Sequence, residues 1–127
     1  MQEVVAALIE KENKFLICQR PKGKNLEMKW EFAGGKIEKG ETPEQALIRE
    51  CQEELAITLN VYEKIAESTH KYKDSEIHIV LFRTTIKEGT PTMLEHNDMQ
   101  WITLDEAENF DFCPSDKEFV EELKKIR

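Results

Sequence analysis

Three glutamates on one predicted helix are the residues of this chain best suited to chemistry. Glu50, Glu53 and Glu54 occupy positions i, i+3 and i+4, which places their carboxylates on one helical face. Like charges at this spacing repel by about 0.2–0.5 kcal/mol per pair, and the C-terminal end of a helix favours cations. A bound divalent cation such as Mg²⁺, Ca²⁺ or Mn²⁺ would offset both costs, because these ions prefer oxygen ligands. From the glutamates alone, the alternative to a metal site is an ordinary acidic helix face that is exposed to solvent.

The helix that carries these glutamates has clear start signals. Thr42 is a good N-cap, Pro43 suits the first helical position, and Gln45 completes a capping box. A separate apolar arc on the helical wheel is formed by Leu47, Ile48, Cys51 and Leu55. We therefore expect a helix over residues 42–55 that packs through one face and presents carboxylates on another.

The spacing of glycine, glutamate and arginine around this helix resembles the Nudix box, over the segment from Gly35 to Ile57. The matching elements are Gly35, Glu41, Arg49, Glu50, Glu53 and Glu54. Two positions depart from the pattern. Cys51 replaces a common aliphatic residue, which is harmless because a buried thiol behaves as a small hydrophobe. Ala56 replaces the usual glycine, which predicts either a right-handed exit from the helix or roughly 1 kcal/mol of strain.

The resemblance implies hydrolysis of a phosphoanhydride with Mg²⁺ as the cofactor, and with Mn²⁺ as a possible substitute. Carboxylates hold the metal ion, and the metal ion binds the phosphates. The implied metal ligands are Glu50, Glu53, Glu54 and the backbone carbonyl of Gly34. Either Glu50 or Glu53 is also expected to activate the attacking water. Arg49 is expected to orient the glutamates by pairing with Glu41, whereas a surface salt bridge of little energetic worth is the alternative.

Outside the box, the run WEFAGGKIE at residues 30–38 resembles the MutT and CTP pyrophosphohydrolase branches of the family. The resemblance implies that Glu95 corresponds to a glutamate of the MutT branch that acts on the metal or the water. The alternative is that Glu95 is a solvated loop residue. Arg20 and Lys36 are candidate phosphate clamps, of which arginine is better suited to bidentate contact. An exposed residue at a strand end is the alternative for Arg20.

The base of a nucleotide is expected near Phe32, near the strands around His78, and near the start of the last helix. Packing or surface positions are the alternatives for Phe32 and His78. Asp116 distinguishes the two branches of the family that this chain resembles. At this position MutT has an asparagine, whereas the CTP branch has an aspartate that follows a proline and a small residue. An ionised carboxylate only accepts hydrogen bonds, which suits the amino group of cytosine or the N1–H and amino edge of guanine. Capping of the last helix is the alternative role for Asp116.

By this resemblance the reaction is hydrolysis of a nucleoside triphosphate to the monophosphate and diphosphate. The expected substrates are oxidised or modified nucleotides such as 8-oxo-dGTP, together with CTP and dCTP derivatives. One alternative is another Nudix activity, on ADP-ribose, nucleotide sugars or dinucleoside polyphosphates. A second alternative is a non-catalytic nucleotide-binding module, which the loss of box glutamates would mark.

Composition is compatible with a small enzyme of one domain over residues 1–127, monomeric or homodimeric. Its 18 basic and 26 acidic residues give a net charge of −8, which argues against a nucleic-acid polymer as a partner but not against a small nucleotide. We expect no membrane span, since no apolar run approaches twenty residues, and no signal peptide. The odd number of cysteines predicts free thiols in the cytoplasm rather than disulfides or a zinc site. They are Cys18, Cys51 and Cys113.

The remaining patterns predict an α/β fold. Strands are expected at residues 4–9, 15–20, 30–32, 59–72, 76–87 and 99–104. A short helix is expected to start at residues 105–108, and a final helix to be capped by Ser115 or Asp116. The core stripe expected on that last helix is Phe119, Val120, Leu123 and Ile126. The family resemblance implies that a mixed β-sheet is sandwiched between α-helices, in an α/β/α sandwich.

Overall fold

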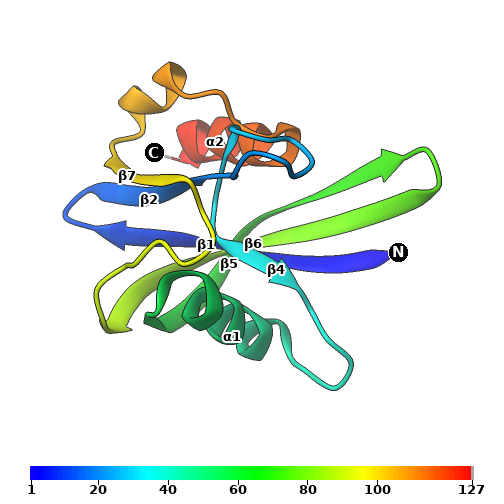
Figure 1. Cartoon of the computed structure of the whole chain (residues 1–127), viewed down its shortest axis with the longest axis horizontal. Coiled ribbons are helices and arrows are strands. Elements are labelled where there is room, and N and C mark those ends of the chain that lie inside the picture. Colours follow the sequence, from blue (N-terminus) through cyan, green and yellow to red (C-terminus); the bar gives the residue numbers. More distant parts are fainter. Residues whose placement is uncertain (127) are drawn as a thin grey trace.

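The computed structural model describes residues 1–126 and contains a mixed sheet, two α-helices and a 3-10 helix (Figure 1). The helical elements are α1 (Pro43–Leu55), η1 (Asp105–Asn109) and α2 (Pro114–Ile126). The strands are β1 (Gln2–Lys11), β2 (Lys14–Gln19), β3 (Trp30–Glu31), β4 (Gly34–Lys36), β5 (Thr58–Tyr72), β6 (Ser75–Glu88) and β7 (Asp98–Ile102). Among the described residues, no helix is both long enough and apolar enough to cross a membrane.

Strand β1 is the hub of the sheet. It runs parallel to β6 and antiparallel to β2 and β4, and β2 in turn pairs with β3 and β7. The sheet is completed by β5, which forms a long antiparallel hairpin with β6 that projects from the body of the molecule (Figure 1). The mixed sheet predicted by the family resemblance is therefore confirmed.

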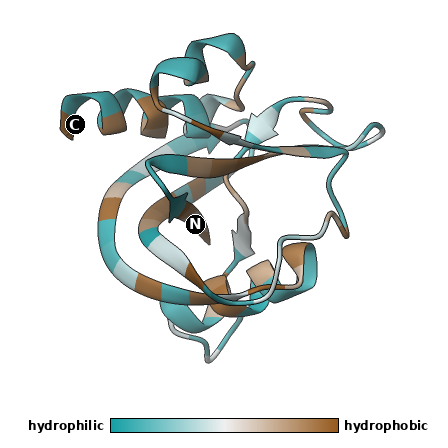
Figure 2. Ribbon diagram, turned by 90° about the vertical axis from the view of Figure 1, so that its left-hand side faces the viewer, coloured by the Kyte–Doolittle hydropathy of each residue, from teal (hydrophilic) through white to brown (hydrophobic). Residues whose placement is uncertain are grey.

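The two helices cover opposite faces of the sheet, as an α/β/α sandwich requires (Figure 1). Alternate residues of β1 point to opposite faces. Val5 and Ile9 pack in the core cluster with Leu47 of α1, whereas Leu8 packs in the other cluster with Phe119 of α2. Figure 2 shows the corresponding alternation of hydrophobic and hydrophilic residues along the curved strands.

Helix α1 begins as its sequence predicts. Thr42 Oγ1 accepts a hydrogen bond from the backbone N–H of Gln45 at 3.1 Å, and Gln45 Oε1 accepts one from the Thr42 N–H at 2.9 Å. The helix ends at Ala56, which adopts a left-handed conformation with φ 57° and ψ 37°. Of the two outcomes expected for this alanine, the structure therefore contains the strained one.

The glycine pair lies outside the strands predicted from sequence, but in the structure it belongs to the separate short strand β4 against β1. Gly34 pairs with Ala6, and a Cβ at Gly34 would overlap the carbonyl oxygen of Val5. Glycine is thus required here by the close approach of two backbones. Strand β3 is correspondingly shorter than predicted and stops before Phe32.

Helix α2 differs from its prediction at both ends. It begins at Pro114, so Ser115 and Asp116 lie inside its first turn and neither is the N-cap. Phe119 and the other two predicted core residues are buried, but Ile126 is 60% exposed. The prediction for Ile126 was wrong because helical spacing continues past the point where the sheet stops covering the helix.

Candidate active site

Glu50 of α1 lies directly against the glycine pair of β4. A Cβ at Gly35 would overlap the carboxyl group of Glu50, so glycine at this position allows the Glu50 side chain to lie directly against β4. Glu50 accepts a hydrogen bond from Arg49 Nη1 at 2.9 Å and is partly buried. The strand and the helix together therefore fix the Glu50 carboxylate beside the backbone at residues 34–35.

Arg49 is the centre of an ion-pair network at the outer edge of the site. Its guanidinium donates to both oxygens of Glu41, from Nε at 2.7 Å and from Nη2 at 2.9 Å, in the paired geometry that suits arginine and carboxylate. Nη2 also donates to the carbonyl of Lys36 at 3.1 Å, which ties α1 to β4. These hydrogen bonds from Arg49 lower the pKa of Glu41 to about 2.

Glu54 is the most unusual ionisable residue of the helix. Its side chain is almost fully buried, and its Oε2 has no hydrogen-bond partner among the described residues. Burial, together with the neighbouring charges of Glu31, Glu50 and Glu95, raises its pKa to about 9. A buried carboxylate oxygen without a partner is costly unless a cation or proton meets it. This arrangement fits a divalent cation held by Glu50 and Glu54.

The third glutamate of the helix is placed differently. The Glu53 side chain is 54% exposed and lies 3.5 Å from Arg49, and Glu53 does not line the cavity described below. The three carboxylates thus share a helical face without converging on one point. Of the described residues, those that bring three ligand atoms within 4.8 Å of one another are Glu31, Cys113 and Asp116.

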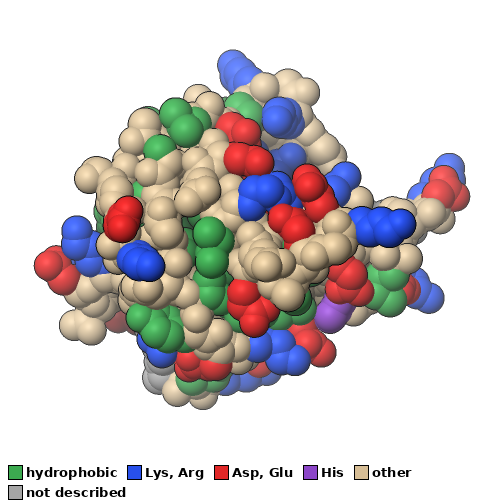
Figure 3. Space-filling view, turned by 90° about the horizontal axis from the view of Figure 1, so that it is seen from below, with side chains coloured by type: hydrophobic (Ala, Val, Ile, Leu, Met, Phe, Trp, Pro, Cys, Tyr) green, Lys and Arg blue, Asp and Glu red, His purple; other side chains and the backbone are tan. Residues whose placement is uncertain are grey.

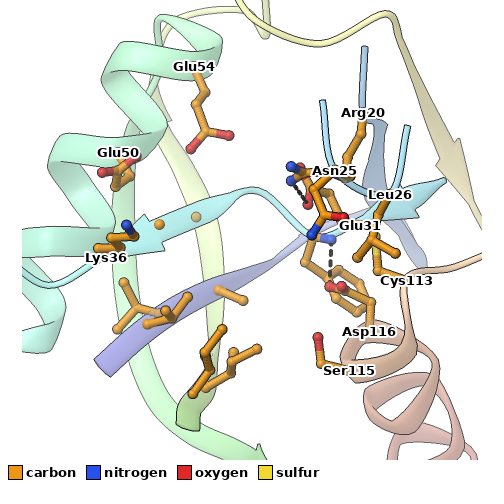
Figure 4. A pocket seen from close by; sticks show the side chains of 18 of the residues that line it. Arg20, Asn25, Leu26, Glu31, Lys36, Glu50, Glu54, Cys113, Ser115 and Asp116 are labelled. Carbon is orange, nitrogen blue, oxygen red and sulfur yellow. Dashed lines mark hydrogen bonds and ion pairs between the residues drawn. The ribbon is translucent and has the colours of Figure 1, made fainter. Parts of the chain in front are cut away.

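A cavity of about 740 Å³ extends from the glutamates of α1 to the start of α2 (Figure 4). Glu50 and Glu54 project from one side of it, and Cys113, Ser115 and Asp116 lie on the other. The predicted site residues that line it are Arg20, Phe32, Gly34, Lys36, Glu50, Glu54, Glu95 and Asp116. The fold therefore brings together residues that are far apart in the sequence.

Asp116 closes the far end of this cavity. Its Oδ1 accepts a hydrogen bond of 3.0 Å from the backbone N–H of Phe32, which joins α2 to the end of β3 (Figure 4). Burial raises the pKa of Asp116 to about 8. The carboxyl group is thus neutral up to near-neutral pH, so it donates as well as accepts, which differs from the ionised acceptor assumed from sequence.

The cations predicted to clamp phosphates have different surroundings. Arg20 lines the cavity, but its guanidinium forms an ion pair of 3.0 Å with Glu31 and donates to the carbonyl of Asn25 at 2.7 Å. Lys36 is exposed at the end of β4 on the glutamate side of the cavity (Figure 4). His78 does not line the cavity, and its Nδ1 pairs with Glu3 at 2.6 Å, so we leave it out of the proposed site.

Two cavity residues were missed by reasoning from sequence. Glu31 sits between Arg20 and His96, and its Oε2 lies 3.0 Å from Nε2 of the histidine. Only 4% of the His96 side chain is exposed, although it follows Glu95 in a polar loop. Loop sequence carries no periodicity that reports burial, so nothing in the sequence predicted this position.

The group formed by Glu31, Cys113 and Asp116 is better explained by contacts within the protein than by a metal ion. Arg20 and His96 already bind the two oxygens of Glu31, and the Phe32 N–H binds Asp116. Cys113 is buried, and burial raises the pKa of its thiol to about 12, which disfavours the thiolate that a metal requires.

The face that carries α1 bears no continuous basic stripe. Figure 3 shows acidic and basic side chains interspersed over this side of the molecule.

Comparisons with known proteins show which family the chain belongs to. The NUDIX domain family model matches residues 1–123. The chain is 37% identical to CTP pyrophosphohydrolase of Escherichia coli over 127 residues, covering 100% of this chain and 94% of that protein. It is 32% identical to 8-oxo-dGTP diphosphatase of Escherichia coli, covering 99% of this chain and 98% of that protein. The solution structure of the Escherichia coli ORF135 protein superposes with a TM-score of 0.89 at 36% identity, covering 100% of this chain and 91% of that one. The chain therefore belongs to the Nudix hydrolase family.

Proposed function

We propose that this protein is a Mg²⁺-dependent nucleoside triphosphate pyrophosphohydrolase that converts its substrate and water into a nucleoside monophosphate and diphosphate. The proposal rests on one observation: the same cavity has carboxylates of α1 at one end and Asp116 at the other. We infer CTP and dCTP derivatives and oxidised nucleotides such as 8-oxo-dGTP as substrates. Two relatives that match nearly the whole chain are named for these activities.

The triphosphate would lie at the α1 end of the cavity. Glu50 and Glu54, with the carbonyl of Gly34, would hold the divalent ion, and exposed Glu53 would complete the acidic set from outside. The ion, when bound, neutralises charge on the phosphates and polarises the bond that breaks. Lys36 stands on the same side with an exposed ammonium group and is the cation best placed for a phosphate.

The residue that takes the proton of the attacking water is one of the cavity carboxylates. Glu50 lines the cavity and Glu53 does not, which favours Glu50 of the two candidates. Glu95 also lines the cavity, close enough for its charge to raise the pKa of Glu54, and is a further candidate to bind the ion or the water.

The base would lie at the α2 end, against Phe32 and beside the Asp116 carboxyl group. Oδ1 of Asp116 is engaged by the Phe32 N–H, so its other oxygen is the group that would contact a base edge. With a pKa of about 8, that oxygen can carry a proton or lack one near neutral pH. Both a cytosine and an oxidised guanine therefore offer complementary groups to it.

The experiment that tests this proposal compares CTP, 5-methyl-dCTP, 8-oxo-dGTP and ADP-ribose as substrates, with products identified by chromatography. We expect monophosphate and diphosphate in equal amounts from at least one triphosphate, and only in the presence of Mg²⁺ or Mn²⁺. Turnover of ADP-ribose alone would contradict the proposal in favour of another Nudix activity. Tight nucleotide binding without any hydrolysis would identify a binding module instead.

The three cysteines support a cytoplasmic location for this activity, since all are buried, free thiols as the sequence predicted. A net charge of −8 is unfavourable for binding a phosphate polymer, so we propose a small-molecule nucleotide as the partner rather than a nucleic-acid polymer or a membrane. The active unit would be a monomer or a homodimer.

A further inference from the structure

One buried histidine connects the two ends of the proposed site. Nε2 of His96 lies 3.0 Å from Oε2 of Glu31 and 3.5 Å from Oε1 of Glu54. The other oxygen of Glu31 is bound by Arg20 at 3.0 Å. A continuous chain of ionisable groups therefore runs from Arg20, just after β2, through Glu31 and His96 to the carboxylate expected to bind the metal.

The loop that carries His96 is fixed on both sides. The N–H of Leu94 donates to the carbonyl of Glu54 at 3.2 Å, and the N–H of Thr92 donates to that of Leu55 at 2.9 Å. After the histidine, the N–H of Asn97 donates to the carbonyl of Gln19 at 2.9 Å. These bonds attach the loop to the end of α1 and to the end of β2, so the imidazole is held rigidly between the two carboxylates.

The surroundings of the Glu54 carboxylate indicate that this group binds a ligand and does not serve packing alone. Within residues 1–126, Oε2 of Glu54 has no hydrogen-bond partner, and only 6% of the Glu54 side chain is exposed. Since an ionised carboxylate only accepts hydrogen bonds, Nε2 of His96 must donate to Glu31. The same nitrogen lies 3.5 Å from Oε1 of Glu54, within ion-pair distance, so the contact of His96 is with this oxygen and not with Oε2.

We propose that His96 is a positioning residue, which orients the carboxylates of Glu54 and Glu31 so that the unpaired oxygen of Glu54 is presented to a divalent cation. This inference rests on the proposed function, because it assumes that Glu54 is a ligand. Groups that hydrogen-bond a ligating carboxylate fix its orientation before the metal arrives. The imidazole N–H also offsets part of the repulsion between Glu31 and Glu54, because Nε2 lies near an oxygen of each carboxylate.

The test measures Mn²⁺ binding directly, by calorimetry or electron paramagnetic resonance, on the full chain without nucleotide. His96→Leu removes the donor at similar volume, and we expect about 10–100-fold weaker Mn²⁺ binding. His96→Gln retains an N–H near the position of Nε2, and we expect affinity within about threefold of wild type by the same reasoning. His70→Leu is the matched control, because it removes an imidazole paired with Glu118 away from the cavity, and should leave the Mn²⁺ affinity unchanged.

The outcomes separate this inference from the proposed function. If His96→Leu binds Mn²⁺ as tightly as wild type, or if His96→Gln is as impaired as His96→Leu, His96 does not position Glu54 through its N–H. If His96→Leu does not fold, as judged by thermal unfolding, His96→Asn replaces it, because its shorter amide cannot reach both carboxylates. Wild-type protein that binds no Mn²⁺ and hydrolyses no nucleotide would instead overturn the function itself.

Discussion

Two glutamates one helical turn apart in α1, Glu50 and Glu54, differ in their hydrogen-bond partners and in their burial. Glu50 receives a hydrogen bond from Arg49, whereas Glu54, four residues later, is buried with one oxygen unpaired. Arg49 thus relieves the repulsion between the outer carboxylates of the box without neutralising the inner one. The negative charge of the buried Glu54 carboxylate must therefore be compensated by a proton or by a cation in the cavity.

Arg49→Lys tests the importance of the paired guanidinium geometry. Lysine keeps the charge but cannot donate to both oxygens of Glu41 and to Glu50 together, so Glu50 should lose its fixed orientation. We expect kcat for a triphosphate to fall by about tenfold or more, with little change in KM. Steady-state kinetics would measure this. Arg83→Lys, which alters an exposed pair with Glu63, is the control and should retain wild-type kcat.

Asp116→Asn should stabilise the protein in a way that depends on pH. Folding raises the pKa of this carboxyl group from 3.8 to about 8, so ionisation opposes folding. Wild-type stability should therefore fall relative to the variant as pH rises from about 4 to 8, and the gap should stay constant above that. Asparagine cannot ionise, and its carbonyl still accepts from the Phe32 N–H.

Thermal unfolding of wild type and Asp116→Asn at pH 5 and pH 8 measures this gap. A gain of at least about 1 kcal/mol, or roughly 4 °C, is expected at pH 8 and a smaller one at pH 5. An equal shift at both values would show that the Asp116 carboxyl group has an ordinary pKa in the fold.

At the scale of elements, α1 has an ideal start and a strained end. The capping box at Thr42 is present as its sequence predicts, whereas Ala56 adopts the left-handed conformation that glycine normally supplies. The strain lies two residues after Glu54, next to the point where the loop that carries His96 is hydrogen-bonded to residues 54–55. The sequence indicated this position only as a departure from the usual pattern, and the structure decides between the two expected conformations.

Ala56→Gly should therefore stabilise the fold. Glycine removes the left-handed penalty of about 1–2 kcal/mol, and part of that gain is lost to its greater freedom in the unfolded chain. A net gain of about 0.5–1 kcal/mol is expected from chemical denaturation. Ala46→Gly, inside the same helix, is the control and should destabilise by a similar amount or more. Loss of stability in Ala56→Gly would mean that this turn is not strained by its alanine.

Elements with strong local signals could be predicted from the sequence, and those defined by distant contacts could not. The capping box, the two helices and the long strands follow from caps and periodicity, and each is observed. Strand β4 was missed because three residues against β1 carry no alternation of their own. The first turn of α2 was misplaced because Asp116 bonds to Phe32, far away in the sequence, instead of capping its helix.

Across the whole molecule, the sheet separates two halves of one site. In the proposed site one helix supplies the carboxylates and the other supplies Asp116, on opposite faces of the sheet, and the cavity that joins them is lined by residues 4–6 of β1. The family resemblance predicted which residues gather there more fully than the local pattern did. Burial of His96 and Glu54 depends on the assembled fold, which explains why neither was foreseen.

Metal binding should stabilise the fold as a whole. A cation that binds Glu50 and Glu54 only in the folded state should raise the unfolding free energy by about 2.7 kcal/mol at a hundredfold excess over Kd. Thermal unfolding with Mn²⁺ and with chelator would measure the shift. The same shift in Glu54→Gln would show that the ion binds elsewhere, for instance among the exposed acidic groups that give the net charge of −8.

The central claim is that carboxylates of α1 hold the divalent ion that a polyphosphate requires. Its most direct test is Mg²⁺-dependent release of diphosphate from CTP and 8-oxo-dGTP by wild type and Glu54→Gln, with Glu63→Gln as an exposed control. We predict that Glu54→Gln, while remaining folded, loses activity by about 100-fold or more, and that Glu63→Gln does not. Folded Glu54→Gln protein that releases diphosphate at the wild-type rate would contradict this account.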